Sequence, residues 1–581
     1  MSNLDQLRHS TAHLLASAVL EIWPNTKPTI GPSIENGFYY DFQFVEPISD
    51  KDLSRIEQKM RELSKKWESF ERQELSEKEA KEYFKGNEYK LELLEEISKK
   101  GEKITVYKSG NFTDLCRGGH VEKPKEQLKH FKLLNLAGAY WRGDEKKSML
   151  TRIYGTAFAT KEELEKYLWQ IEEAKKRDHK KLGKELDLFM FSELVGPGLP
   201  LWTPKGTIIR NLLDAYIWKL RKAKGFERVT IPHITKRDLY EKSGHWAKFS
   251  TELFRITSRE GHEFAMKPMN CPHHTQIFAH LPRSYKQMPQ RYAETTMVYR
   301  DEQTGELSGL SRVRSATQDD AHVFCRFNQI KDEVLAIWDI INTFYGTFGF
   351  ELRIRLSMHD PANMSAYLGT EEKWERAESI LKDLLIKRNA EYFEGIGEAA
   401  FYGPKLDFIG KDSMGRDHQV ATIQLDINMP DQFDLYCTNE QGEQERVVMI
   451  HCAIMGSIER FMSVLIEHTA GNFPVWLAPV QIDILPVSDK HTEQAFKVHT
   501  ILQNADIRSQ LIDENKTLSY KIRESTLQKV PYIAIIGDKE LEADNSNGAI
   551  VTLRKRDGSD QRQLPVSELI QIIQNHIENY Q

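Results

Sequence analysis

The sequence predicts an α+β protein of several domains. Its 581 residues exceed the size of a single domain, which is about 100–200 residues. Strand-like and helical stretches alternate irregularly up to about residue 470, which is typical of an antiparallel sheet with helices on it. Beyond Pro474, strands and helices alternate regularly, as in a small α/β domain. We therefore expect domains at residues 1–160, 186–474 and 475–581, with a linker helix at 161–185.

The composition excludes several classes of protein. Hydrophobic residues make up 40% of the chain and charged residues 29%, as in ordinary globular proteins. No apolar run of about 18 residues appears, and MSNLDQLRHS lacks a signal pattern, so we expect a cytoplasmic protein without a membrane span. A net charge of −6 gives no sign of nucleic-acid binding, although such binding depends on local patches. Scattered cysteines favour ligands, catalysts or buried residues over disulfides.

Local patterns predict the main elements. Residues 4–22 have the spacing of an amphipathic helix, and residues 24–44 are typical of strands and turns. A Lys/Glu-rich helix is predicted at 161–185. Another covers about 205–224, where Gly225 is placed to act as a C-cap, and a strand at 229–231 stops at Pro232. The last region reads as strand 481–485, helix 490–504, strand 508–512, helix 517–528, strands 532–537 and 549–553, and helix 565–578.

The stretch from Thr296 to Phe327 concentrates charged side chains. Two apolar-flanked segments, joined by a turn with Gly305 and Gly309, predict a β-hairpin. Its arginine forks suit phosphate and carboxylate oxygens, because they give bidentate charge-assisted hydrogen bonds. A charged hairpin standing alone is more often a solvated surface. The polar residues concerned are Arg300, Glu302, Arg312, Arg314, Gln318, Asp319, Asp320 and His322.

Three separate residues are candidate metal ligands. Cys271, His322 and His451 would supply one thiolate and two imidazoles, leaving one position open on a tetrahedral zinc. An open position is the mark of a site that binds a substrate. Spacing alone cannot show that the three residues meet, and a buried cysteine with hydrogen-bonded histidines is the ordinary alternative.

Several long motifs resemble those of class II aminoacyl-tRNA synthetases. TMVYRDEQTGELSGLSRVRSATQDDAHVF resembles their second signature motif, and GSIERF, with Arg460, resembles the third. The helix from Gly206 and the strand ending at Pro232 resemble the first more loosely. HSTAHLLASAV, DLCRGGH, KPMNCP, TQDDAHVF, FYGPKLDF and GSIER point to the threonyl-tRNA synthetase family, from residue 1 to 581. That family usually begins with a ubiquitin-like domain ahead of the HSTAH helix, so we expect a truncated or a naturally short form here.

The resemblance implies a threonine–tRNA ligase with an editing domain, a class II catalytic core and an anticodon-binding domain, in that order. Such an enzyme uses ATP and Mg²⁺ to form threonyl-adenylate and transfers threonine to tRNA(Thr). Since the first motif usually forms a dimer interface in this class, a homodimer is expected. One zinc per subunit is implied at Cys271, His322 and His451, binding the amino group and hydroxyl of threonine. An apolar pocket would distinguish threonine from valine by only about 10²-fold.

The resemblance also assigns roles near the zinc. Catalysis of this kind rests on positioning and on cationic stabilisation of phosphate oxygens. The residues implied to be catalytic are Arg300, Lys405 and Arg460. Those implied to bind ATP are Arg300, Glu302, Arg312, Gln424 and Arg460, and those implied to bind threonine are Gln318, Asp320 and Tyr402. One position departs from the class, which commonly stacks a phenylalanine on adenine where this chain has Ala316. We expect a working enzyme with an ordinary or somewhat raised KM for ATP.

An N-terminal site is implied as well. His9 and His13 lie four residues apart on a helix and share a face, and Cys116 and His120 are also four apart, which looks like a zinc tetrad. The same four residues occur in the editing domains of threonyl- and alanyl-tRNA synthetases. Serine keeps the hydroxyl, and a missing methyl costs only about 1–3 kcal/mol, so Ser-tRNA(Thr) has to be hydrolysed. The family implies a metal-free site in bacterial threonyl enzymes. The implied editing residues are His9, His13, Lys90, Asp114, Cys116 and His120.

Residues 475–581 resemble an anticodon-binding domain. The implied contacts are Asn515, Arg523, Glu540 and Arg554, which are polar as unstacked base edges require, although each alone reads as a solvated residue. Two alternatives remain for the whole chain: another class II enzyme, such as a prolyl or seryl enzyme, and a non-catalytic or regulatory RNA-binding paralogue. The candidate zinc ligands, together with Asp320, argue against the first. The second usually lacks a motif arginine or a zinc ligand, and Arg300 and Arg460 are both present.

Overall fold

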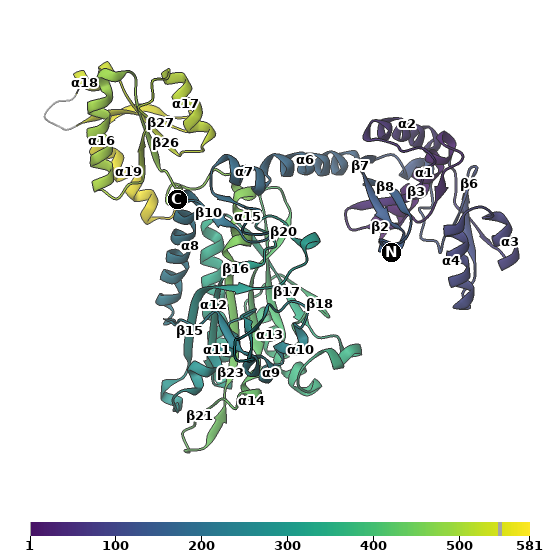
Figure 1. The fold of residues 1–581 in the computed structure, drawn as a ribbon, viewed down its shortest axis with the longest axis horizontal. Coiled ribbons are helices and arrows are strands. Elements are labelled where there is room, and N and C mark those ends of the chain that lie inside the picture. Colours follow the sequence, from purple (N-terminus) through teal and green to yellow (C-terminus); the bar gives the residue numbers. More distant parts are fainter. Residues whose placement is uncertain (1, 544–548) are drawn as a thin grey trace. The chain divides into compact units, whose positions relative to one another are not determined.

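The fold class expected from the sequence is confirmed. The structure is a computed structural model that describes residues 2–543 and 549–581 (Figure 1). Its contacts define two compact units, the first ending at Glu172 and the second beginning at Glu173. Each unit combines helices with mainly antiparallel sheets. Within the described part of the chain, no helix has the length and apolar character needed to cross a lipid bilayer.

Helix α1 (Asn3–Ile22) organises the first unit. Ser2 caps it: the Ser2 hydroxyl accepts the Asp5 N–H, and the Asp5 carboxylate accepts the Ser2 N–H. The buried face of α1 packs on a sheet of order β1-β3-β8-β7. These strands are β1 (Lys27–Pro28), β3 (Gly37–Gln43), β8 (Met149–Ala157) and β7 (Phe131–Tyr140), with β2 (Ser33–Ile34) beside β3.

A smaller sheet in the same unit precedes the DLCRGGH segment. It has the order β4-β5-β6, and Cys116 follows its last strand directly. The strands are β4 (Glu71–Glu74), β5 (Thr105–Ser109) and β6 (Phe112–Leu115). The remaining helices are α2 (Leu53–Ser64), α3 (Glu77–Tyr83), α4 (Glu88–Lys99) and α5 (Pro124–Gln127). The position of Cys116 is therefore fixed by the end of β6.

The single helix predicted at 161–185 is wrong. The structure has two helices there, α6 (Lys161–Arg177) and α7 (His179–Glu185). Asp178 between them has a non-helical backbone (φ −47°, ψ 120°), and its carboxylate accepts the N–H of Lys180. An aspartate in this position satisfies a free N–H at a helix start, which favours a new helix over continuation.

An eight-stranded sheet forms the centre of the second unit. Its order is β11-β15-β16-β23-β20-β19-β17-β18, antiparallel except at the two edge pairs. The strands are β11 (Glu227–Arg228), β15 (Gln290–Tyr299), β16 (Ser315–Cys325), β23 (Val448–Ser457), β20 (Asp417–Asp426), β19 (Lys405–Lys411), β17 (Glu351–Met358) and β18 (Tyr392–Ile396). The predicted hairpin is confirmed as β15 and β16. The strand predicted at 229–231 is wrong, because β11 ends at Arg228 and only the Val229 N–H extends the pairing.

Helices and short strands surround this sheet. Its core includes apolar residues of α8, α12, α13 and α15. The helices are α8 (Pro204–Ala223), α9 (Arg237–Lys242), α10 (His245–Lys248), α11 (Cys271–Ala279), α12 (Ile330–Thr347), α13 (Glu371–Lys387), α14 (Met429–Gln432) and α15 (Ile458–Thr469). The short strands are β9 (Phe189–Met190), β10 (Leu201–Trp202), β12 (Ile234–Lys236), β13 (Arg255–Thr257), β14 (Glu263–Met266), β21 (Tyr436–Thr438) and β22 (Gln444–Arg446).

The last part of the second unit is the expected α/β domain. Its sheet has the order β25-β24-β26-β27-β28, parallel around β24 and antiparallel from β26 onward. The elements are β24 (Ile482–Pro486), α16 (Thr492–Asn504), β25 (Ser509–Leu511), α17 (Leu518–Leu527), β26 (Tyr532–Ile536), α18 (Asp538–Glu542), β27 (Ile550–Lys555), β28 (Gln561–Pro565) and α19 (Val566–Glu578). Sequence patterns missed α18, which is one short turn, and β28, whose residues are mostly polar.

A buried ion pair connects three elements of the large sheet. Arg221 of α8 and Asp319 of β16 are almost fully buried, with Nη2 and Oδ2 3.3 Å apart. The Asp319 carboxylate also accepts the backbone N–H groups of Ile454 and Met455 on β23, at 3.0 and 3.1 Å. One side chain therefore connects α8, β16 and β23.

Replacing Asp319 with alanine should destabilise this unit by about 3–5 kcal/mol, because Arg221 and two N–H groups lose their buried partner. Urea unfolding monitored by tryptophan fluorescence measures the change. The matched control is Asp339→Ala, since Asp339 forms ion pairs with Lys224 and Arg388 at the surface. That variant should lose at most about 1 kcal/mol. Equal losses in the two variants would contradict the structural role of Asp319.

Candidate functional site

One row of neighbouring residues crosses four strands of the large sheet. Lys405 on β19 lies opposite Gln424 on β20, and Gln424 lies opposite His451 on β23. His451 in turn lies opposite His322 on β16. Directly opposed residues share a face of an antiparallel sheet, so this register gathers all four side chains on one side. In the sequence, these four residues do not lie next to one another.

The structure brings together the three predicted metal ligands. The donor atoms of Cys271, His322 and His451 all lie within 4.8 Å of one another, and all three residues are buried. Cys271 enters from the start of α11, while the histidines come from paired strands. Burial raises the pKa of the Cys271 thiol and lowers the pKa of His322, so the protein alone favours the uncharged forms. One sulfur and two nitrogens fit a zinc site with an open position.

Two residues that the sequence reading missed orient these histidines. His322 Nδ1 lies 2.8 Å from His274 Nδ1, and His451 Nε2 lies 3.1 Å from a carboxylate oxygen of Asp426. His322 Nε2 and His451 Nδ1 then face each other at 3.1 Å, toward Cys271. Outer contacts of this type fix the ring orientation of metal-binding histidines. His274 could have been found, because it lies three residues after Cys271 on one helix face, whereas nothing in the sequence marks Asp426.

Two of the predicted threonine-binding residues lie beside this triad. Asp320 Oδ1 is 3.7 Å from His322 Nε2, and its other oxygen accepts a 3.0 Å hydrogen bond from the Asn270 amide. The Tyr402 ring centre is 5.1 Å from that of His451. Burial raises the pKa of Tyr402, which keeps its hydroxyl protonated and able to donate. Asn270, which the sequence reading also missed, fixes the position of Asp320.

A polar cavity of about 510 Å³ adjoins the triad side of β16. Arg300, Glu302, Arg312, Gln318 and Arg460 line it, so the structure brings these predicted residues together. The same cavity wall includes the unusual Ala316. Its small side chain leaves that part of the wall without an aromatic ring.

The arginines of this cavity differ in their contacts. Arg312 is held by two carboxylates, with Nε 2.8 Å from Glu302 and Nη2 3.0 Å from Glu306. Arg314 donates to the backbone oxygen of Glu302 and so supports the segment that joins β15 to β16. The Nε of Arg300 is buried without a hydrogen-bond partner among the described residues. Arg300 therefore has a free donor for a ligand.

Lys405 and Gln424 do not line that cavity. The Lys405 ammonium lies 3.0 Å from the fully buried carboxylate of Asp407, and the Gln424 amide donates to the Gly403 carbonyl at 3.0 Å. Both lie in the row that leads to His451. The structure thus places these two residues on the triad side of the site.

His179 is a further residue that the sequence reading missed. Its Nδ1 lies 2.7 Å from a carboxylate oxygen of Glu467 on α15, and its Nε2 accepts the Leu310 N–H at 3.1 Å. Since Nε2 accepts, Nδ1 carries the proton. Gly309 has φ +51°, and a Cβ there would lie 2.3 Å from His179 Nε2. This histidine therefore anchors the segment between β15 and β16 that carries Arg312. Nothing in the charged sequence around His179 marks this role.

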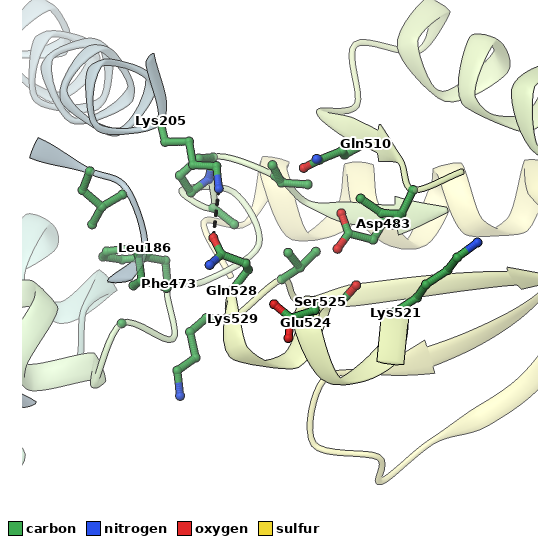
Figure 2. Close-up of a pocket in the computed structure, with 17 residues that line it drawn as sticks. Leu186, Lys205, Phe473, Asp483, Gln510, Lys521, Glu524, Ser525, Gln528 and Lys529 are labelled. Carbon is green, nitrogen blue, oxygen red and sulfur yellow. Dashed lines mark hydrogen bonds between the residues drawn. The ribbon is translucent and has the colours of Figure 1, made fainter. Parts of the chain in front are cut away.

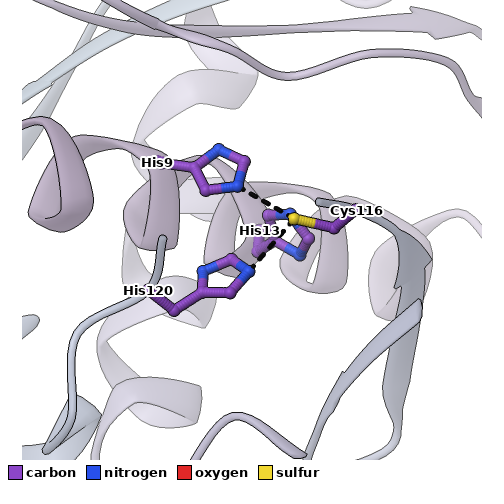
Figure 3. Close-up of side chains that lie close together, drawn as sticks. All are labelled: His9, His13, Cys116 and His120. Carbon is purple, nitrogen blue, oxygen red and sulfur yellow. Dashed lines mark hydrogen bonds between the residues drawn. The ribbon is translucent and has the colours of Figure 1, made fainter. Parts of the chain in front are cut away.

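The first unit contains a second cluster (Figure 3). His9 Nε2 lies 3.1 Å and His120 Nε2 3.3 Å from Cys116 Sγ, and His13 completes a group whose donor atoms lie within 4.8 Å of one another. Burial raises the pKa of Cys116 to about 11 and lowers that of His120 to about 2. The predicted tetrad thus assembles, with a protonated thiol and neutral imidazoles at neutral pH.

The other two predicted editing residues form a buried pair in the same unit. Lys90 Nζ lies 2.5 Å from Asp114 Oδ1, and the Tyr40 hydroxyl donates to the other Asp114 oxygen. Both charged residues are almost fully buried. Both oxygens of the Asp114 carboxylate therefore have a partner, Lys90 on one and Tyr40 on the other.

Among the described residues, no hydrogen bond or ion pair joins the four predicted anticodon contacts to one another. Glu540 is buried, and its carboxylate accepts from Thr552, Gln563 and the Gly537 N–H. Arg554 donates to Gln561. Asn515 and Arg523 are exposed. The exposed pair remains free for a ligand, whereas Glu540 holds α18 against β27.

Comparison with known protein families identifies the class. Residues 254–469 match the class II core domain of tRNA synthetases for Gly, His, Pro, Ser and Thr, and residues 481–576 match an anticodon binding domain. Residues 104–154 match the second additional domain of threonyl and alanyl tRNA synthetases. With the antiparallel sheet and its polar cavity, these matches define a class II aminoacyl-tRNA synthetase.

Similar proteins narrow the class to a family. A threonine–tRNA ligase of Porphyromonas gingivalis is 46% identical over 578 residues, which cover 98% of this chain and 87% of that protein. One of Cytophaga hutchinsonii is 46% identical over 575 residues, covering 98% and 88%. A crystal structure described as the RNA binding domain of threonyl-tRNA synthetase from Cryptosporidium parvum is 38% identical, with a TM-score of 0.65, covering 68% of this chain and 98% of that one. The chain belongs to the threonyl-tRNA synthetase family, as its motifs predicted.

The Cys116 environment predicts an unusual pH profile of alkylation. Because the thiolate is the reactive form and the pKa is about 11, iodoacetamide labelling of chelator-treated protein should still accelerate above pH 10. The same protein in urea should instead approach its maximum rate near the ordinary cysteine pKa of about 8.5. Mass spectrometry of the Cys116 peptide separates it from the four buried cysteines. A folded-state plateau at the urea value would contradict the buried, uncharged thiol.

Proposed function

We propose that this protein ligates L-threonine to tRNA(Thr) with ATP and hydrolyses mischarged Ser-tRNA(Thr) at its N-terminal site. The triad of Cys271, His322 and His451 beside Asp320 is the observation that carries the proposal. Its thiol and imidazoles converge within 4.8 Å, next to a carboxylate that can accept a hydrogen bond from a hydroxyl. Family membership supports the reaction class, and the triad supports threonine as the amino acid.

Threonine would be held by charge and hydrogen bonding near the triad. A zinc ion bound by the triad would supply a Lewis-acid centre for the amino group and the hydroxyl. Asp320, fixed by Asn270, would accept a hydrogen bond from the hydroxyl, while Tyr402 and Gln318 orient the amino group. Valine offers no hydroxyl and leaves Asp320 unpaired in a buried site, which is costly.

The adjoining cavity is the proposed ATP site. Arg300 lines the cavity and has a free buried donor, so it suits both the threonine carboxylate and the α-phosphate. Arg460 and Arg312 would hold the outer phosphates with Mg²⁺, and Glu302 the adenine edge. Lys405 and Gln424 act from the triad side. Positioning and cationic stabilisation then favour attack of the carboxylate on the α-phosphorus, with release of pyrophosphate.

Amino-acid-dependent ATP–pyrophosphate exchange tests the main reaction. Threonine and serine should support exchange, whereas valine should not, because only the first two offer a hydroxyl. Cys271→Ala should abolish exchange, while Cys437→Ala, which removes another buried cysteine, should retain it. Exchange that is lost equally in both variants, or wild-type exchange with valine, would overturn the proposed basis of selectivity.

The N-terminal cluster is proposed to work without metal. His9, Cys116 and His120 would position the ester and a water, with Lys90 and Asp114 supporting them. The protonated thiol and the neutral imidazoles carry no charge, and they are suited to form hydrogen bonds with a water molecule.

Metal analysis separates the two clusters. Purified protein should contain one zinc per chain, and Cys271→Ala should remove it, while Cys116→Ala should leave the zinc content unchanged. Cys116→Ala should also retain threonine-dependent exchange but lose hydrolysis of Ser-tRNA(Thr). Two zinc ions per chain, one lost with each variant, would refute the metal-free assignment.

The remaining assignments complete the proposal. We place an editing domain at 1–160, a linker at 161–185, the catalytic domain at 186–474 and the anticodon-binding domain at 475–581. Asn515 and Arg523 are available for base contacts, and Arg554 and Glu540 come from the same domain. A homodimer through the first motif is part of this proposal.

A further inference from the structure

A second cavity in the 173–581 unit lies away from the site described above (Figure 2). Its volume is about 320 Å³, at the small end of pockets that hold organic ligands. Strand β24 and helix α17 form one wall, and Lys205 of α8 reaches it from the other side. None of the residues assigned above to threonine, ATP or editing lines it.

Asp483 is the feature of this cavity that demands an explanation. The residue is 3% exposed and lies on β24 between two core isoleucines. Its Oδ1 has no hydrogen-bond partner among the described residues. In Figure 2 its carboxylate points into the cavity. A buried carboxylate oxygen without a partner is costly, and native structures rarely leave one.

The carboxylate is charged under ordinary conditions. Burial raises the pKa of Asp483 to about 6, while the Ser525 hydroxyl and the charge of Lys205 act in the opposite direction. Above that pH the group is an anion, and its free oxygen can accept from a cationic donor. A nearby lysine would ordinarily neutralise such a carboxylate. Lysines line this cavity, but none of them forms an ion pair with Asp483.

Two of the three lysines that line the cavity, Lys205 and Lys521, are bonded to other groups. Lys205 Nζ donates to the Gln528 side chain at 3.0 Å, and Lys521 Nζ donates to the Pro486 carbonyl at 3.1 Å. Figure 2 shows the Lys521 and Lys529 ammonium groups directed away from Asp483. Glu524 adds a second carboxylate, and no ion pair joins it to any described residue. The cavity therefore presents two carboxylates that lack a bonded cation.

We propose that this cavity binds a small organic cation, an amine or a guanidine, with its N–H groups on Asp483 Oδ1 and Glu524. A bare metal ion fits less well, because the described residues offer no third carboxylate, histidine or cysteine close to these two. An organic cation has several N–H donors and fills more of the space. Gln510 and Ser525 add polar groups for its remaining donors.

Agmatine, which has a guanidinium at one end and an ammonium at the other, is the probe. Isothermal titration of the full chain should show saturable 1:1 binding. Asp483→Asn keeps the shape and removes the charge, so affinity should fall about tenfold or more, as expected for a lost charged hydrogen bond. Glu524→Gln should weaken binding as well. Glu493→Gln, which removes an exposed carboxylate of the same domain outside the cavity, should bind like the wild type.

Two further readouts keep the test decisive. Agmatine affinity should decline as the pH falls through about 6, because Asp483 becomes neutral there. Threonine-dependent exchange should be unchanged in Asp483→Asn, which shows that the variant is folded and that its binding defect is separate from catalysis. The proposal is overturned if the wild type shows no saturable binding at millimolar agmatine, or if Asp483→Asn binds as tightly as the wild type. Either outcome leaves the ligase assignment intact.

Discussion

The pairing register of β16 with β23 is the constraint on which the catalytic arrangement depends. It sets His322 opposite His451, and through β20 and β19 it extends the same row to Gln424 and Lys405. A shift by one residue would turn each of these side chains to the other face of the sheet. Asp319 secures the register, because its carboxylate on β16 binds two backbone N–H groups of β23.

The two His/Cys clusters share chemistry but differ in support. In both, burial raises the pKa of the cysteine thiol, and it lowers the pKa of a neighbouring histidine, His120 in one cluster and His322 in the other. In the group of Cys271, His322 and His451, each histidine has an outer partner, His274 for His322 and the Asp426 carboxylate for His451. In the N-terminal cluster, His120 Nδ1 lies 3.2 Å from the Ser10 hydroxyl, but no carboxylate stands behind it, and the Nδ1 of His13 is buried without a described partner. An oriented histidine with a carboxylate behind it is suited to hold a metal, and this contrast supports different roles for the two groups.

Sequence patterns predicted much of the fold because hydrophobic periodicity and long motifs are local signals. The hairpin, α1, α8 and most of the last domain were recovered in this way. The break at Asp178 was missed, since helical spacing continues through it and only the cap geometry reveals it. The ligand residues followed from family motifs. Their supports, Asn270, Asp426 and His179, did not, because each contacts a partner distant in sequence. Asn270 lies in the KPMNCP motif, but nothing in that motif shows that its amide binds Asp320.

The ion pairs of Arg312 with Glu302 and Glu306 give the protein its own counter-ions at the mouth of the polar cavity. A simple inorganic anion must displace two carboxylates that the chain holds beside Arg312 at a high local concentration. Such an anion has no hydrogen-bond donors for the displaced carboxylates. A larger ligand can occupy Arg312 and still satisfy the displaced groups by its own donors. Arg312 is thereby protected from abundant small anions by charge alone.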